Sequence, residues 1–488
     1  MRKICILTLA FCASVTPVAA QFLRMTLDEA LELGLPVVEV VTVDSVMPTA
    51  TPVDHPEGAS GFSVTDVTKV PGRVDIWMPD HTLAYSSGNY LEGKSGMTIK
   101  IRGNNSARRK LKPYKIKLQK KADLLCRGNE QLYEDKNWLL LKEWKNTLNT
   151  PIGFKVSELL DFAWTPSCRQ VNLLLNGEYH GIYLLTEQVR RNPRCRINVD
   201  KESGYIIERD IYWWVAPLYF ETNLSRSQAG GTWQRYTFKY PDEEDVTEEQ
   251  IDYIRSAMNR MESAVVTGMG YGEFLDVRSF AAWTLGHDIL GTHDGAGANR
   301  FIIKYDNTPN TRFHMGTLWD FETNFYTPDE WSVLHNYYSY YAPYLFPAAD
   351  RSFARSYVRQ WQVLSPVLEQ RMSAFLDSIA ASPEAAALER SRSLEAKLYY
   401  RSYQSVADNV AEAKEWFRSR RAWIDGHIAE IDTVDIGIGI KETKEEINSL
   451  QMVNSEWSNG KCFDLTGRRL AAPPAKGVYI MDGKKVAR

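Results

Sequence analysis

The sequence predicts an α+β fold of two lobes, in which a β-rich part precedes a helical part. Between residues 72 and 118 apolar and polar side chains alternate, which is typical of strands with one buried face. After residue 247 apolar residues recur at three- and four-residue intervals, which is typical of helices. Strands followed by helices indicate an α+β protein, and a cleft between two lobes is a natural ligand site.

The composition limits the classes of function. Of the 488 residues, 44% are hydrophobic and 24% are charged, as in ordinary globular proteins. The net charge of −3 gives no general attraction to nucleic acid, so we expect no nucleic-acid partner. After the N-terminal residues no run of about 18 uninterrupted apolar residues occurs, so we expect no transmembrane segment.

A β-hairpin is predicted in the first part of the chain. Asn176-Gly177 favours the left-handed backbone of a two-residue turn. This turn joins Val171–Leu175 to Glu178–Leu185, in a register that places Cys168 opposite Leu185. Further strands are predicted at Asn137–Leu141 and Gly204–Asp210.

Helices are predicted in five segments. Pro151 lies near the first turn of the first segment, where proline is tolerated. Thr247, with Glu249 and Gln250 close behind, resembles a capped helix start. The segments are Thr150–Leu160, Thr247–Val265, Phe274–Thr292, Phe353–Ile379 and Val406–Ile431.

The N-terminus is typical of a secretory signal peptide. Arg2 and Lys3 precede an apolar run, and Val18-Ala19-Ala20 provides small residues for cleavage. We therefore expect export to the periplasm, the cell surface or the exterior. We favour cleavage after Ala20 over processing as a lipoprotein. Export permits disulfides, but the sequence does not choose a pairing among Cys126, Cys168, Cys195 and Cys462.

Three polar residues late in the chain predict a phosphoryl-transfer site. Asp294 is followed by Asn299 five positions later and then by Asp320 within a Trp-Asp-Phe triplet. Phosphoryl transfer to a hydroxyl needs one carboxylate to orient the acceptor, and an amide with a second carboxylate to hold Mg²⁺. Protein kinases place these groups in this order. The ordinary structural alternatives are a turn cap for Asp294 and a turn residue for Asn299.

Strand pairing would bring the last two of these residues together. The two strand-like runs after Asn299 flank an Asn-Thr-Pro-Asn turn. If Asp306 pairs with Thr311, Asn299 falls opposite roughly residue 318, within reach of Asp320.

A basic segment supplies candidates for phosphate binding. Residues 101–121 contain nine Lys or Arg and no acid, and the ordinary interpretation is a solvated edge that discourages aggregation. Alternation puts Lys115 and Lys117 on one strand face, where one inward lysine would contact phosphates. Arg102 and Asn104 belong to a turn that can present N–H groups to phosphate. Glu187 is a further candidate for cofactor binding, where it would mark a hinge between the lobes; the ordinary alternative is that it merely ends a strand.

The chain resembles the spore-coat protein H (CotH) kinase-like family, an atypical branch of the protein-kinase fold. The resemblance runs from about Leu35 to about Phe325. It rests on several blocks in the right order: RGNNS…KPYKIKLQKKADLL, NWLLL, VNLLLNGEYHGIYLLTEQV, GYIIERD and the D…N…WDFE set that ends at Glu322.

The resemblance implies ATP-dependent protein phosphorylation with Mg²⁺ or Mn²⁺. Lys117 matches the lysine that ends the YxIK strand and would contact phosphates, Asp294 matches the catalytic acid, and Asn299 and Asp320 match the metal-binding pair. The chain departs from the family at Glu322, where a second Asp is common. It also departs at Leu148-Asn149-Thr150-Pro151, where Arg-Asn is frequent.

The predicted organisation has four parts. Residues 1–20 are the signal peptide and 21–72 a β-rich extension. Residues 73–434 form the kinase-like domain, with its first lobe ending at about 200. Residues 435–488 form a linker and a short β module that looks like the C-terminal sorting modules of secreted Bacteroidetes proteins.

We therefore expect an exported atypical kinase that moves the ATP γ-phosphate to Ser or Thr of a secreted or surface protein. The alternative is a catalytically degenerate surface binding protein on the same fold. A third interpretation is a carbohydrate-active enzyme with Asp294 and Asp320 as an acid/base pair.

Overall fold

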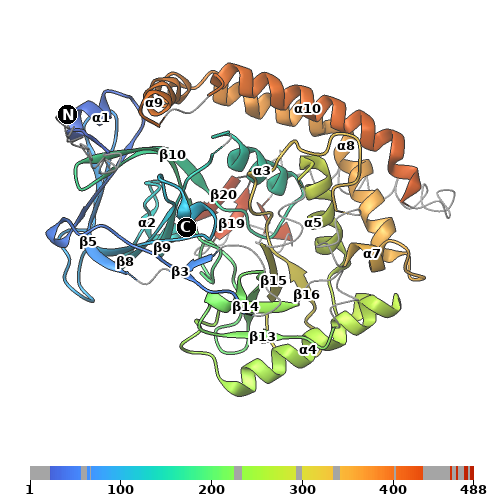
Figure 1. Cartoon of the computed structure of the whole chain (residues 1–488). Helices are drawn as coiled ribbons and strands as arrows, with labels where there is room; N and C mark the ends of the chain where they lie inside the picture. Colours follow the sequence, from blue (N-terminus) through green and yellow to red (C-terminus); the bar gives the residue numbers. More distant parts are fainter. Residues whose placement is uncertain are drawn as a thin grey trace, which may run out of the picture.

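The computed structural model describes most of the chain as a mixed α+β protein, as predicted (Figure 1). The described residues are 22–56, 63–65, 68–144, 146–224, 234–292, 299–333, 341–399 and 403–431, together with the backbone of four short strands between 462 and 487. The predicted signal peptide lies outside them. The two-lobed arrangement, the domain boundaries and export stay predictions.

The first sheet closes on itself. Its strands pair in the order β11-β10-β2-β5-β7-β8-β9, and β9 pairs again with β11, so that these strands form a ring, here called the strand ring. Only the β10–β2 pair is parallel among these. The ring strands are β2 (Val37–Thr42), β5 (Val70–Trp77), β7 (Met97–Ile101), β8 (Tyr114–Ala122), β9 (Asp135–Leu141), β10 (Cys168–Leu175) and β11 (Glu178–Glu187).

Short strands flank the ring. β1 pairs with β11 and β6 pairs with β5, whereas β3 and β4 form a separate hairpin. Their bounds are β1 (Leu23–Arg24), β3 (Thr51–Val53), β4 (Ser63–Thr65) and β6 (Leu83–Ser86).

Alternation along the ring strands separates an apolar inner face from a basic outer face. Ile99 on β7 and Ile116 on β8 are fully buried in a cluster of apolar side chains. Lys100, Lys115 and Lys117 occupy the intervening positions and therefore project from the opposite face.

The second sheet is antiparallel and has the order β13-β14-β12-β15-β16. Its strands are β12 (Tyr205–Arg209), β13 (Tyr219–Glu221), β14 (Arg235–Tyr240), β15 (Arg300–Lys304) and β16 (Phe313–Met315).

All five predicted helices are confirmed, with ends shifted by a few residues. At the start of α4 the hydroxyl of Thr247 accepts a hydrogen bond from the Gln250 backbone N–H. The Gln250 side chain in turn accepts one from the Thr247 backbone N–H, which completes a capping box. α9 was not predicted. The helices are α1 (Leu27–Leu31), α2 (Glu130–Tyr133), α3 (Asn149–Leu159), α4 (Glu248–Thr267), α5 (Val277–Leu290), α7 (Ala342–Leu345), α8 (Ser352–Ala380), α9 (Pro383–Tyr399) and α10 (Val406–His427).

The largest apolar core joins the second sheet to the helices. α5 runs through it, and every residue from Phe280 to Leu290 is buried. α3, α8 and α10 pack on α5, and Figure 1 shows α8 and α10 running along the outside of the molecule. This core fixes β15 and β16, the strands that carry the candidate site. No helix in the described part of the chain combines the length and apolar character needed to cross a lipid bilayer.

One predicted register is wrong. Leu175 pairs with Glu178 as expected, but a β-bulge between Leu173 and Leu174 shifts the remaining pairs by one. Cys168 therefore lies opposite Thr186 instead of Leu185. Among the described residues Cys168 and Cys195 are free thiols.

The C-terminal residues form four short strands in the order β18-β17-β19-β20. The strands are β17 (Cys462–Phe463), β18 (Arg469–Leu470), β19 (Val478–Met481) and β20 (Lys484–Ala487). The predicted linker before them lies outside the described residues.

Candidate functional site

Asn299 and Asp320 meet across the β15–β16 hairpin. Lys304 pairs with Phe313 and Ile302 with Met315, which is the register that the sequence predicts. The Asn299 side-chain Nδ2 donates a hydrogen bond of 3.0 Å to Oδ2 of Asp320. The predicted convergence of these two residues is therefore present in the fold.

Both residues have a left-handed backbone. The φ angle is 57° at Asn299 and 67° at Asp320. Asn and Asp tolerate this conformation better than other residues with a Cβ, but it still costs on the order of 1 kcal/mol each. Conformations of this kind persist only where the surroundings hold them, and they concentrate at functional sites.

Aromatic packing holds Asp320 in place. Its neighbours Trp319 and Phe321 are 7% and 3% exposed. Both rings pack on Phe154 of α3, with centroids 5.9 Å and 5.5 Å away. Asp320 itself is half-buried between them. The carboxylate is therefore positioned by two rings that enter the core on either side of it.

The pair fits a hard divalent cation. Its hydrogen bond uses the amide nitrogen of Asn299, so the amide oxygen remains for a metal beside the Asp320 carboxylate. Mg²⁺ prefers oxygen ligands, and it is usually held by one or two protein groups with substrate phosphates and water. Among the described residues no three His, Cys, Asp or Glu side chains gather as a metal site of their own, so phosphates would complete the shell.

Charged groups from both sheets face each other near this pair. Arg102, at the end of β7, interacts electrostatically with Asp320 and with Glu208 of β12, and burial lowers the pKa of its guanidinium. Lys239 of β14 forms an ion pair of 2.6 Å with Glu208. Burial also raises the pKa of Glu208. The outer face of the strand ring thus approaches the second sheet through groups of opposite charge.

The two candidate lysines differ in burial. Lys115 lies opposite Lys100 of β7, and Lys117 lies opposite Thr98. Lys117 is exposed, whereas Lys115 is half-buried. Burial is the main cause that lowers the pKa of Lys115 to about 7, and the positive charges of Arg190 and Lys100 are the next largest causes.

The profile of the CotH kinase protein family matches residues 99–424. The chain belongs to the CotH kinase family. No curated protein matches the sequence. Among solved structures, the chain is similar to one described as the Shewanella oneidensis MR-1 toxin–antitoxin system HipA, HipB and its operator DNA complex. The identity is 12%, with 80% of this chain and 75% of that chain covered, and the TM-score of 0.29 is too low to indicate a shared fold.

Two CotH-family positions have a clear structural setting. Glu322, where the family often has Asp, forms an ion pair of 3.4 Å with Arg109, whose guanidinium lies 4.6 Å from the ring centre of Trp144. Asn149, in the segment that departs from Arg-Asn, is buried at the start of α3, and its backbone oxygen accepts a hydrogen bond of 3.2 Å from Asn324.

Glu187 has protein partners on both carboxylate oxygens. It is 1% exposed. Arg127 donates to its Oε1 at 3.0 Å, and the Ser167 backbone donates to its Oε2 at 2.9 Å. These contacts fix the end of β11. Its contact with a cofactor stays a prediction.

The loop after β7 reaches the second sheet. Asn104 is half-buried, and its backbone oxygen accepts from Ala107 at 3.2 Å. Asn105 donates to the hydroxyl of Tyr212 at 3.4 Å. The turn therefore lies beside the segment that follows β12, and phosphate binding by Arg102 and Asn104 stays a prediction.

The predicted catalytic acid, Asp294, lies outside the described residues. Its role as acceptor base stays a prediction, and so does the acid/base pair with Asp320 that the carbohydrate alternative requires.

Sequence reasoning missed three charged residues of the second sheet: Glu208, Asp210 and Lys239. Arg209 pairs with Arg300, so Asp210 continues the register to a position opposite Asn299. Its Oδ2 accepts from Thr237 at 3.4 Å. The available signal was the placement of charged residues within otherwise apolar strands.

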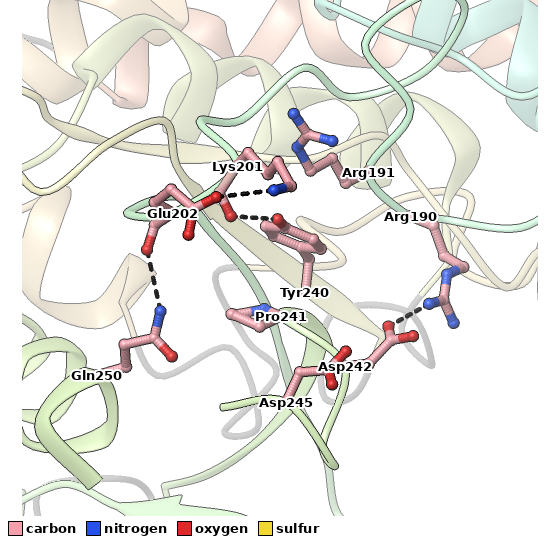
Figure 2. A pocket seen from close by; sticks show the side chains of 9 residues that line it. All are labelled: Arg190, Arg191, Lys201, Glu202, Tyr240, Pro241, Asp242, Asp245 and Gln250. Atoms are coloured by element: carbon pink, nitrogen blue, oxygen red, sulfur yellow. Dashed lines mark hydrogen bonds and ion pairs between the residues drawn. The ribbon is translucent and has the colours of Figure 1, made fainter. Parts of the chain in front are cut away.

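A separate polar cavity of about 300 Å³ lies beside the connection between the two sheets. Figure 2 shows Arg190 paired with Asp242 on one side, and Tyr240 and Gln250 on the other. Arg190 also interacts electrostatically with Lys115. This cavity therefore neighbours the basic face of the strand ring.

Proposed function

We propose that the chain is an atypical kinase that transfers the γ-phosphate of ATP to Ser or Thr side chains of a protein, with a divalent metal. The observation that carries the proposal is the 3.0 Å contact between Asn299 and Asp320 in a CotH-family chain. These side chains are far apart in sequence and are brought together by a hairpin with strained backbone at both positions.

The residues divide the chemistry between them. Asn299 and Asp320 hold the metal, which neutralises phosphate charge when bound. Arg102 faces the same carboxylate from the strand ring and would act on the charge that develops on the transferred group. Asp294 would accept the proton of the acceptor hydroxyl. Phosphates would lie along the basic face of β8, where Lys115 and Lys117 are the two candidate contacts.

The proposed setting is outside the cytoplasm, with ATP and a secreted or surface protein as partners. The support is the sequence of residues 1–20, with its basic start, apolar run and small-residue cleavage site. The C-terminal strands support a surface-directed module of the kind found in secreted Bacteroidetes proteins.

Transfer of label from γ-labelled ATP in the presence of Mg²⁺ or Mn²⁺ tests the proposal. Asp320→Asn is the informative variant, because it keeps the shape and the hydrogen bond to Asn299 but removes the charge. We expect its transfer rate to fall roughly 100-fold or more, since a metal supplies several kcal/mol of stabilisation. Glu202→Gln, an exposed acid elsewhere, is the control. Equal label on wild type and Asp320→Asn would contradict the proposal.

A second candidate is a nucleotide-binding protein without transfer activity. The ion pair between Glu322 and Arg109 favours it, because the second acid of the WDFE motif is directed to an arginine. Thermal unfolding separates the two. Both functions predict a metal-dependent rise in the melting temperature with ATP, but only the kinase also moves label to a protein acceptor.

A further inference from the structure

Lys115 is a half-buried cation with no counter-ion in contact. It makes no hydrogen bond or ion pair with any residue that the structure describes. Its neighbours differ, because Lys239 is paired with Glu208 at 2.6 Å and Arg190 is paired with Asp242. Lys117 is exposed to solvent. Withdrawing an unpaired charge from water is costly, so such a group commonly has a ligand as its partner.

The surroundings of Lys115 are mainly positive. The groups that act on it are Arg190 from the connection after β11, Lys100 on β7, Lys239 on β14 and Lys117 on its own strand. One acid also acts on this group: Glu243, after β14, interacts electrostatically with Lys239, Lys100 and Lys115. On the β9 side, Lys115 pairs with Leu139, which is apolar. This concentration of positive charge between the two sheets suits a ligand with several negative charges.

We propose that Lys115 contacts the phosphates of the nucleotide directly, and that it takes up a proton when the nucleotide binds. The inference rests on the proposed function and refines it. Lys117, on the same face but exposed to solvent, would contribute at most a long-range attraction. Arg102 lies on the same outer face of the ring, toward Asp320, so that a phosphate chain between Lys115 and the metal pair would pass Arg102.

The proton follows from the environment of Lys115. Burial and the neighbouring cations lower its pKa to about 7, so at pH 8 only about a tenth of the free protein carries this charge. Contact with phosphate favours the charged form and raises the pKa. Nucleotide affinity therefore falls as pH rises above 7, and below 7 the lysine is already charged and gives no further gain.

Calorimetric titration at pH 8 in two buffers of different ionisation enthalpy measures the proton directly. Mg²⁺-ATP and Mg²⁺-tripolyphosphate are the probes, because the phosphates alone should be sufficient for the effect. We expect wild type to take up close to one proton for each ligand bound.

Three variants isolate the side chain. Lys115→Ala should lose roughly 10- to 100-fold in affinity, as expected for a charged hydrogen bond, together with the proton uptake. Lys115→Arg stays charged at every pH, so it should keep most of the affinity but lose the uptake. Lys117→Ala tests the competing phosphate contact on the same face: if Lys115 is the contact, this variant should stay within about threefold of wild type and keep the uptake.

The outcomes separate this inference from the proposed function. If Lys117→Ala weakens binding and Lys115→Ala does not, or if wild type binds without proton uptake, Lys115 is not the phosphate contact and the kinase proposal stands. If wild type binds neither probe in the presence of metal, the nucleotide site itself is refuted, and the inference with it. Circular dichroism confirms that each variant is folded.

Discussion

Gly153→Ala should disturb the segment that holds Asp320. Gly153 lies within α3, and a Cβ there would be 2.2 Å from both Cδ1 and Cε1 of Phe321. Carbon atoms in contact normally lie about 3.5–4.0 Å apart, so the ring would have to retreat by more than about 1 Å. Phe321 is 3% exposed and packs edge-on against Phe154 at 5.5 Å. The ring therefore has little room to move without shifting Asp320.

Two energies compete in this variant. Overpacking a full core costs roughly 1–3 kcal/mol, and alanine is favoured over glycine in a helix by up to about 1 kcal/mol. Because the overlap is severe and the ring is enclosed, we expect a net loss of about 1–2 kcal/mol in the free energy of unfolding. A displacement of about 1 Å at Asp320 would lower the rate of phosphoryl transfer roughly 10- to 100-fold.

Urea denaturation and the labelled-ATP assay measure the two effects. Gly426→Ala is the matched control, because it lies in α10 with nothing within 4 Å of the added Cβ, and it should be neutral or stabilising. Gly153→Ala combined with Phe321→Leu should recover part of the stability, because the smaller side chain replaces the ring that the added Cβ overlaps. A Gly153→Ala protein as stable and as active as Gly426→Ala would refute the packing argument.

Two further predictions concern stability. Lys142 and Glu395 form an ion pair of 2.6 Å between the strand ring and α9, with side chains only 1% and 8% exposed. Glu395→Ala should therefore lower the free energy of unfolding, measured by urea denaturation, by roughly 3–5 kcal/mol, because it leaves Lys142 buried without its partner. The double variant Lys142→Met with Glu395→Leu should stay close to wild type. Burial lowers the pKa of His180 to about 3, so the unfolded chain binds a proton there that the folded chain does not, and stability falls as pH decreases from about 6.5 toward 3 at up to about 1.4 kcal/mol for each pH unit. His180→Phe, which preserves the stack on Phe22 at 4.0 Å, should reduce that loss in denaturation curves at pH 4 and 7; an unchanged difference would contradict the role of His180.

Local patterns predicted the contact between Asn299 and Asp320 well. The turn after Asp306 and the alternation on both sides fix one register, and that register brings Asn299 to Asp320. The capping box at Thr247 is equally local. In each case the information lies within a few residues, so tertiary packing does not override it.

Other features depend on distant contacts and were not accessible. The bulge at Leu173 and Leu174 shifts the Cys168 register, and the Asn-Gly turn does not encode it. α9 carries little apolar periodicity, and its buried residues include Glu395, whose partner Lys142 is far away in the chain. Alternation placed Lys115 and Lys117 on one face but could not distinguish them. Lys115 is half-buried and interacts electrostatically with Lys239 of the second sheet, which is distant in sequence, whereas Lys117 is exposed.

The closed ring of strands bears on where this domain can be cut. The family profile begins at residue 99, yet β2 and β5 lie before it and sit side by side between β10 and β7. A fragment trimmed to the profile would lack two adjacent strands of the strand ring. The edges left at β10 and β7 would then expose unpaired backbone groups, which can pair with strands of other molecules. The region matched by the family profile thus omits part of the ring, and expression boundaries should include β2 and β5.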